Sequence, residues 1–321
     1  MPTFTFSGVA CQAAPEESVL DALLRHGVEV SNSCRAGACQ SCMLRATSGV
    51  LPAASQQGLK ATLVEQGYFL SCVCRPEGDL VLEPAGGLEF TASIAALERL
   101  SANVLRVRLR TDTPLEYRPG QYLTLRRADG LARSYSLASL PEDGALELHV
   151  RRAPRGRMSG WLFDEARVNE AVTVRGPAGE CFYTGGSPDQ PLLLAGTGTG
   201  LAPLIGILRD ALRLGHRGPI HLYHGALRPE GLYLREELRD FDSAHANLHY
   251  TPVVLEGGEP EGIAAGALDK TITAAHPKLS GWRGFLCGDP GIVQLLKKKL
   301  FLAGMASRDI FADAFVEAPG S

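Results

Sequence analysis

The chain has 321 residues, of which 45% are hydrophobic and 21% charged, and its formal net charge is −3. These values are typical of a globular protein with two or three domains. They exclude the broad basic field that binds nucleic acid, and the sequence has no apolar run long enough to span a membrane.

The first residues, Met1 to Phe6, lack the basic region and apolar core of a signal peptide. We therefore expect a cytoplasmic protein, and we expect it to be a monomer. In a reducing compartment its eight cysteines are predicted to be ligands or buried thiols rather than disulfides.

Four cysteines form the most specific motif of the chain. Cys34, Cys39 and Cys42 follow the spacing C-x4-C-x2-C, and Cys72 comes after twenty-nine further residues. Three thiolates on one loop and a fourth from afar indicate a plant-type [2Fe–2S] cluster. Zinc is the alternative, although only Cys39 and Cys42 have the C-x2-C spacing of a zinc knuckle. Cys74 is a second candidate for the fourth ligand.

Around this motif, short strands and helical turns predict a small mixed sheet with a helix across it. The predicted strands are 3–6, 43–46, 68–72 and 80–83, and the predicted helical segments are 19–27 and 59–65. With its four cysteines matched one by one, the segment resembles the plant-type ferredoxins, which have a β-grasp fold. Gln40 stands where that family often has glycine. We expect a ferredoxin domain over residues 1–86, with a linker at 84–87.

The next part, residues 88–187, is predicted to be an antiparallel barrel. Its expected strands are 91–97, 104–109, 121–125, 134–138, 146–150 and 172–174, with a helix near 159–165. It contains Arg133-Ser-Tyr-Ser136, Gly156-Arg-Met-Ser159 and Gly176-Pro-Ala-Gly179. Together and in this order, these motifs resemble the FAD-binding barrel of the ferredoxin–NADP reductase superfamily.

The resemblance implies FAD rather than FMN and assigns residues to it. Arg133 can bind pyrophosphate with its forked guanidinium, and the Tyr135 ring can lie on the flavin. The helix start at Met158 can hold phosphate. The implied flavin-binding set is Arg133, Tyr135, Ser136, His149, Val150, Arg151, Gly156, Met158 and Ser159. For His149, a structural role on its strand remains an open alternative.

From residue 188 to 321, strands and helices alternate, which predicts a doubly wound parallel sheet. Strand 192–195 leads into Gly196-Thr-Gly-Thr-Gly200 and a helix, and Cys287-Gly-Asp-Pro290 follows a later strand. This part resembles the NAD(P) lobe of the same superfamily. The resemblance implies that Gly198, Thr199, Gly200, Glu230, Cys287 and Gly288 bind the nucleotide, and that Phe315 covers the flavin. Cys287 as an inert buried thiol and Phe315 as core residue remain alternatives.

The whole chain is thus expected to be a multidomain protein of α+β, β and α/β parts. It is similar to the reductase components of bacterial multicomponent oxygenases. The resemblance implies that a nicotinamide nucleotide passes a hydride to FAD, with Ser136, Cys287 and Phe315 beside the reacting atoms. Arg228 favours NADPH, because a 2′-phosphate requires a cation, whereas Glu230 favours NADH, and we expect NADH. The cluster then passes single electrons to an oxygenase partner. A reductase serving a deoxysugar dehydratase, or a cluster-based redox sensor, is the alternative.

Overall fold

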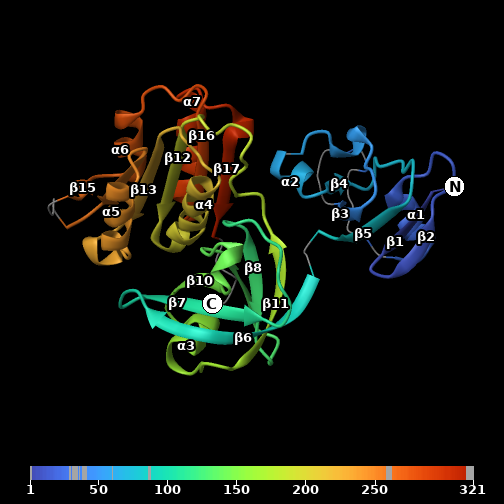
Figure 1. Cartoon of the computed structure of the whole chain (residues 1–321), viewed down its shortest axis with the longest axis horizontal. Helices are drawn as coiled ribbons and strands as arrows, with labels where there is room; N and C mark the ends of the chain where they lie inside the picture. The colour runs from blue at the N-terminus through green and yellow to red at the C-terminus, as the bar shows by residue number, and fades with distance from the viewer. Residues whose placement is uncertain are drawn as a thin grey trace. The chain divides into compact units, whose positions relative to one another are not determined.

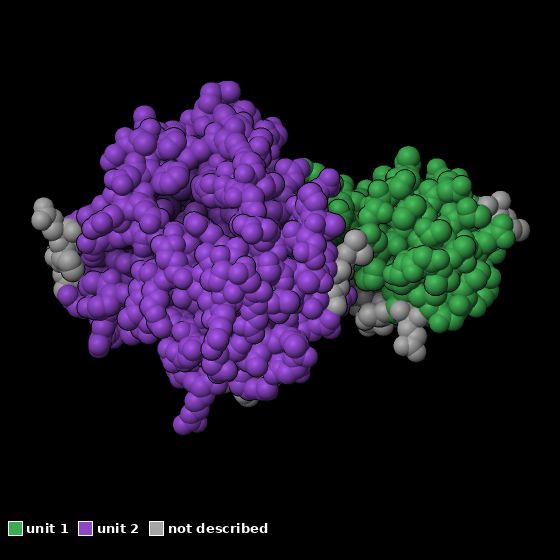
Figure 2. Space-filling model, turned by 60° about the horizontal axis from the view of Figure 1, so that its bottom comes forward, with its two compact units in different colours: residues 1–88 green, residues 89–321 purple. Residues whose placement is uncertain are grey.

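The computed structural model describes residues 2–28, 30, 35, 37, 42–59, 61–85, 88–257 and 262–315. The chain forms two compact units, residues 1–88 and 89–321, which Figure 2 colours separately. Each unit is described by itself below.

Unit 1 contains a mixed sheet with the strand order β2-β1-β5-β3-β4. Its strands are β1 (Thr3–Phe6), β2 (Val9–Gln12), β3 (Met43–Ser48), β4 (Tyr68–Leu70) and β5 (Leu80–Pro84). β1 and β5 pair in parallel, whereas the other pairs are antiparallel. The helical elements are α1 (Val19–Arg25), η1 (Ala53–Gln56) and α2 (Ala61–Glu65). A helix across such a sheet is the β-grasp arrangement predicted from the sequence.

The core of unit 1 explains why α1 forms where it does. Ser18 begins the helix, because its Oγ accepts a hydrogen bond from the Asp21 backbone N–H at 3.1 Å. Val19, Ala22 and Leu23 are fully buried in the same cluster as Phe4 and Phe69 of the sheet. The apolar face of the helix thus covers the inward face of the sheet.

The first half of unit 2 is an antiparallel sheet with the order β10-β7-β6-β11-β8-β9. Its strands are β6 (Leu88–Arg99), β7 (Val104–Thr111), β8 (Tyr122–Arg126), β9 (Ala132–Ser136), β10 (Leu146–Arg151) and β11 (Ala171–Ala178). A bridge between Leu137 and Leu148 joins the two ends of the sheet and closes the barrel. The remaining elements are η2 (Pro141–Asp143) and α3 (Arg157–Asp164), whose Trp161 and Leu162 pack into the barrel core.

The second half of unit 2 is a parallel sheet with the order β15-β14-β13-β12-β16-β17. Its strands are β12 (Leu192–Thr197), β13 (Ile220–Ala226), β14 (Leu248–Val254), β15 (Ala264–Ala265), β16 (Arg283–Gly288) and β17 (Ile310–Ala314). The α-helices are α4 (Leu201–Arg213), α5 (Arg235–Ala244), α6 (Leu268–Ala275) and α7 (Pro290–Leu302), and the 3-10 turns are η3 (Gly198–Gly200), η4 (Pro229–Gly231) and η5 (Ser307–Asp309).

Helices cover both faces of this sheet (Figure 1). Alternate residues of β12 face the two layers of helices. Leu192 and Leu194 pack with α4 and α5, whereas Leu193 and Ala195 pack with α6 and α7. The strand order reverses at β12, which is flanked by β13 and β16. A ligand is therefore expected at the carboxyl end of β12, where the connections diverge.

The three-part fold predicted from the sequence is confirmed. The patterns did not predict β2, β15 or α6. Among the described helices, none is both long and apolar enough to cross a membrane.

Candidate functional site

A cavity of about 880 Å³ opens in unit 2 where the barrel meets the carboxyl end of the parallel sheet. Its walls come from β8, β9 and β10, the start of α3, the turns after β12 and β16, and the end of β17. A volume of this size is within the range of small-molecule and cofactor sites. The cavity brings together these residues predicted from the sequence: Arg133, Tyr135, Ser136, His149, Arg151, Gly156, Met158, Ser159, Gly198, Thr199, Gly288 and Phe315.

The barrel side of the cavity is formed by β9, which carries Arg133, Tyr135 and Ser136. Among the described residues, Arg133 donates one hydrogen bond, from Nη1 to the Ala132 carbonyl at 2.8 Å, which leaves most of its guanidinium donors for a ligand. Burial raises the pKa of Tyr135, so its side chain is a neutral phenol. A flat neutral ring and a forked cation suit the ring and the pyrophosphate of FAD, respectively.

The start of α3 forms a second part of the wall. Gly156 is the N-cap, and a Cβ there would lie 2.4 Å from Ser159 Oγ, so the turn has no room for a side chain. Ser159 Oγ accepts from the Ala153 N–H at 3.1 Å, which fixes the loop before the helix. The first amides of a helix lack intrahelical partners and attract an anion. This end of α3 therefore fits a phosphate group.

The opposite wall is the turn between β12 and α4. A Cβ on Gly200 would lie 2.3 Å from the Cys287 carbonyl oxygen, so β16 approaches the turn as closely as two backbones allow. Gly288 has a φ of 114° and packs against Thr197, whose Oγ1 accepts from the Asp289 N–H at 3.0 Å. Gly198 and Thr199 face the cavity, whereas Gly200 supports them from beneath. The turn fits the pyrophosphate of a dinucleotide.

Ser136 has a partner that the sequence patterns did not reveal. Its Oγ donates to Asp313 Oδ2 at 2.8 Å, across 177 residues of chain. Burial raises the pKa of Asp313, and the bond from Ser136 opposes this increase. Asp313 lies on β17, two residues before Phe315, whose N–H donates to the Gly288 carbonyl at 2.8 Å. At this end of the strand, the sequence pattern predicts a site role only for the aromatic residue, Phe315.

Cys287 is placed beneath the cavity rather than in its wall. It is 1% exposed, and its Sγ lies 3.7 Å from Cys181 Sγ. Burial, reinforced by Cys181, raises the pKa of Cys287 well above its ordinary value, so its sulfur is a thiol. Val150 is buried in the barrel core, and Glu230 is exposed on η4. Neither lies in the cavity wall, so contacts of these two with a cofactor remain predictions.

In unit 1, Cys42 and Cys72 are buried in one small cluster with Leu20 and Leu70. Ser71 holds them together, because its Oγ donates to the Cys42 carbonyl at 2.7 Å. Cys74 instead lies in the main core of the unit, where burial raises the pKa of its thiol to about 11. Cys34 and Cys39 lie outside the described residues. Two soft thiol donors side by side fit an iron–sulfur cluster.

Three family models match the chain. Residues 4–77 match a 2Fe-2S iron–sulfur cluster binding domain, residues 91–183 an oxidoreductase FAD-binding domain, and residues 194–298 an oxidoreductase NAD-binding domain. The protein thus has the binding domains for a [2Fe–2S] cluster, FAD and NAD(P), in agreement with the shape and donors of the sites.

Characterised relatives match over nearly the full length. The chain is 34% identical to the ferredoxin–NAD(P)(+) reductase component of the naphthalene 1,2-dioxygenase system of Pseudomonas putida, over 93% of each chain. It is 33% identical to the reductase subunit of an aromatic O-demethylase from Amycolatopsis, over 98% of this chain and 99% of that one. The cytochrome P450 reductase of Amycolatopsis has a similar structure, with a TM-score of 0.70, 30% identity and 99% coverage of both chains.

Proposed function

Because this chain belongs to the reductase components of oxygenase systems, we propose that it uses NADH to supply single electrons to a partner mono- or dioxygenase component. When bound, FAD accepts an electron pair from a nicotinamide and releases the two electrons singly, as a one-electron cluster requires. The observation that carries the proposal is the single cavity in which flavin-type and nucleotide-type walls face each other.

The residues of the cavity are assigned to binding and orientation. Arg133 and the start of α3 hold the pyrophosphate of FAD, and Tyr135 and Phe315 lie against its ring. Gly198 and Thr199 hold the pyrophosphate of the nucleotide. Ser136 donates its hydroxyl proton in a hydrogen bond to Asp313, so its Oγ is held in one position in the cavity wall and keeps its lone pairs for a ligand.

The choice of NADH over NADPH rests on charge. A 2′-phosphate requires a cationic partner, and Arg228 is the cation closest in sequence to the end of β13. In the structure its Nη2 and Nε both lie 3.2 Å from Glu256 Oε2. The Glu256 carboxylate is paired with the guanidinium of Arg228 and would repel a 2′-phosphate, which favours NADH, the nucleotide without that phosphate.

Steady-state kinetics with both nucleotides test this choice. We expect a higher kcat/KM with NADH, and we expect Glu256→Gln to improve the relative use of NADPH by freeing Arg228. A parent enzyme that used NADPH equally well would overturn the choice.

We further propose three domains, at residues 1–86, 88–187 and 188–321, with Cys34, Cys39, Cys42 and Cys72 as the cluster ligands. If the cluster is the exit for electrons, Cys72→Ser should lose iron and lose most of its reduction of cytochrome c. NADH-driven reduction of a two-electron dye should persist, because unit 2 has its own cores.

Cys74→Ser is the matched control, since it removes one sulfur from the same unit, and both activities should remain. If Cys72→Ser reduced cytochrome c at the parental rate, the proposed exit would be wrong. If Cys74→Ser lost iron and Cys72→Ser kept it, the choice of the fourth ligand would be wrong.

A further inference from the structure

A second cavity of about 680 Å³ lies in unit 2, between the outer face of the barrel and helices α4 and α5. Glu147 of β10 lines this second cavity, and His149, two residues further, lines the flavin and nucleotide cavity. The two side chains are hydrogen-bonded, with His149 Nε2 and Glu147 Oε1 3.0 Å apart. A continuous polar connection therefore runs between the two cavities.

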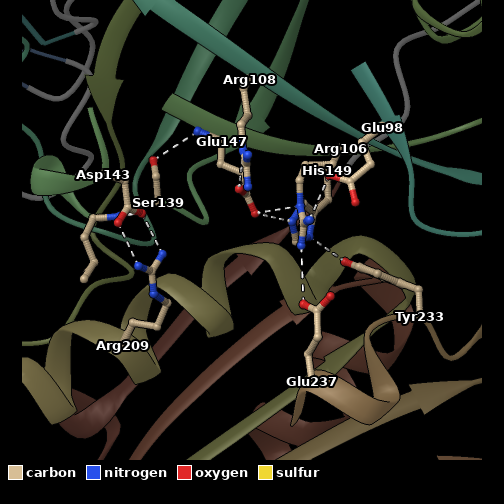
Figure 3. Close-up of polar contacts among 11 residues, drawn as sticks. Glu98, Arg106, Arg108, Ser139, Asp143, Glu147, His149, Arg209, Tyr233 and Glu237 are labelled. Carbon is tan, nitrogen blue, oxygen red and sulfur yellow. Dashed lines mark hydrogen bonds and ion pairs between the residues drawn. The ribbon is translucent and has the colours of Figure 1, made fainter. Parts of the chain in front are cut away.

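Figure 3 shows how this connection reaches the other half of the unit. His149 Nδ1 lies 3.0 Å from the hydroxyl of Tyr233, which precedes α5 in the nucleotide lobe. Behind His149, Arg106 of β7 lies 3.2 Å from Glu147 and 3.4 Å from Glu237 of α5. We call Arg106, Glu147, His149, Tyr233 and Glu237 the inter-lobe network.

The direction of the hydrogen bonds in this network follows from chemistry. Burial raises the pKa of Glu147, but the bond from His149 and the charge of Arg106 outweigh it and lower that pKa to about 2. The carboxylate can only accept, so Nε2 of His149 carries the proton. Burial lowers the pKa of His149 and raises that of Tyr233. The neutral Nδ1 therefore accepts, and the Tyr233 hydroxyl donates to it.

Tyr233 also contacts His224, which lies beside the glycine turn after β12. Its ring meets the edge of the His224 ring, with centroids 5.5 Å apart and planes at 85°. His224 is 0% exposed near the end of β13, beside Gly196 of β12. Its imidazole lies against the backbone of Gly198, although within the described part of the chain neither ring nitrogen makes a well-aligned hydrogen bond. A buried imidazole that lacks a well-aligned partner among the described residues has a better hydrogen bond to gain if the turn moves toward it.

We propose that Tyr233 is a positioning residue that couples the nucleotide turn at Gly198 to the flavin wall at His149. A nucleotide that draws the turn toward His224 stabilises the Tyr233 ring, and the ring holds His149 in one orientation against the flavin. By reciprocity, FAD tightens the binding of the nucleotide by the same factor. The proposal takes from the proposed function only that FAD and NAD(P) are the ligands of the cavity.

The test measures the binding of FAD to the deflavinated full-length protein, with and without saturating ADP-ribose. ADP-ribose has the pyrophosphate that occupies the turn but lacks the nicotinamide, so it cannot stack on the flavin. We expect it to tighten FAD binding in the parent by at least about fivefold, the lower end of common allosteric couplings. In Tyr233→Phe, which removes only the hydroxyl, we expect the ratio to fall close to one.

Tyr250→Phe is the matched control, because Tyr250 is a buried tyrosine of the same lobe whose hydroxyl has no partner within the described residues. It should keep the parental ratio. His224→Leu breaks the connection at its other link, and it should lose the coupling while FAD alone binds with the parental Kd. This variant also decides the question if Tyr233→Phe does not fold.

A parental ratio near one, or an unchanged ratio in Tyr233→Phe, would overturn the proposal. An unchanged ratio in His224→Leu would show that the coupling does not pass through His224, and it would overturn the proposal in this form. Because no electron acceptor is present, these results do not depend on whether the partner is an oxygenase. Histidine NMR gives a second readout: His149 should be the Nε2–H tautomer in the parent, and its pKa should rise in Tyr233→Phe, where no hydroxyl occupies Nδ1.

Discussion

The close approach of β16 to Gly200 gives a prediction whose size can be worked out. Gly200 has a φ of −59°, which any residue adopts, so Gly200→Ala changes only the space that the turn requires. The new Cβ would lie 2.3 Å from the Cys287 carbonyl oxygen and 2.8 Å from Gly288 Cα, whereas real Cβ contacts are essentially never under 3.0 Å. The turn must therefore retreat from β16 by roughly 0.7 Å.

Backbone atoms on both sides make this retreat costly. Overpacking in a core typically costs about 1–3 kcal/mol, and in a unit of this size each kcal/mol lowers Tm by about 2–4 °C. The turn also forms the wall that faces the nucleotide, and a displacement near 1 Å can lower the rate about 100-fold. We expect kcat/KM for NADH, with a dye as acceptor, to fall about 10- to 100-fold.

The assay compares three proteins by thermal denaturation and by NADH–dye kinetics. Gly185→Ala is the control, because a Cβ at that exposed position meets no atom within 4 Å. It should match the parent in both measurements. If Gly200→Ala also kept the parental Tm and kcat/KM, the close approach of β16 to the turn would not be as described, and the reasoning would be refuted.

Three further predictions concern stability. Asp313→Asn should be more stable than the parent, and the difference in unfolding free energy should grow as the pH rises above the ordinary pKa of a carboxyl, because burial raises the pKa of Asp313 and makes its ionisation in the folded state costly. Urea unfolding between pH 4 and 8 checks this, and a difference that does not change with pH would contradict it. Gly160→Ala, inside α3 with open space at its Cβ, should stabilise unit 2 by about 0.5–1 kcal/mol, seen as a higher Tm. Ser18→Ala should destabilise unit 1 by about 1 kcal/mol in urea, because the Asp21 N–H loses its cap.

The parts of the site that the sequence predicted are those that local patterns encode. The Arg133-Ser-Tyr-Ser136 strand, the start of α3 and the glycine turn at Gly198 are short, contiguous signals, and all three line one cavity. The doubly wound sheet of residues 188–321 was also predicted from a local pattern, the alternation of strands and helices. β15, with two residues, is too short to give a period, and it was missed.

The distant partners of the predicted residues Ser136 and His149 could not be found in this way. Asp313 and Ser136 are 177 residues apart, and His149 and Tyr233 are 84 apart. No spacing rule connects such positions, because only the folded sheets bring them together. Val150 shows a limit of motif matching: a strand alternates between two faces, and Val150 packs into the barrel core, so its contact with a cofactor remains a prediction.

The last strand, β17, has a consequence for how the protein is made on the ribosome. Unit 1 is a separate compact unit over residues 1–88 and can fold while the rest of the chain is still being synthesised. The wall of the flavin cavity, in contrast, includes Asp313, Ala314 and Phe315. Until these residues have emerged, Ser136 lacks its acceptor and the cavity stays open on one side. Unit 1 can therefore be folded while the flavin cavity still lacks part of its wall.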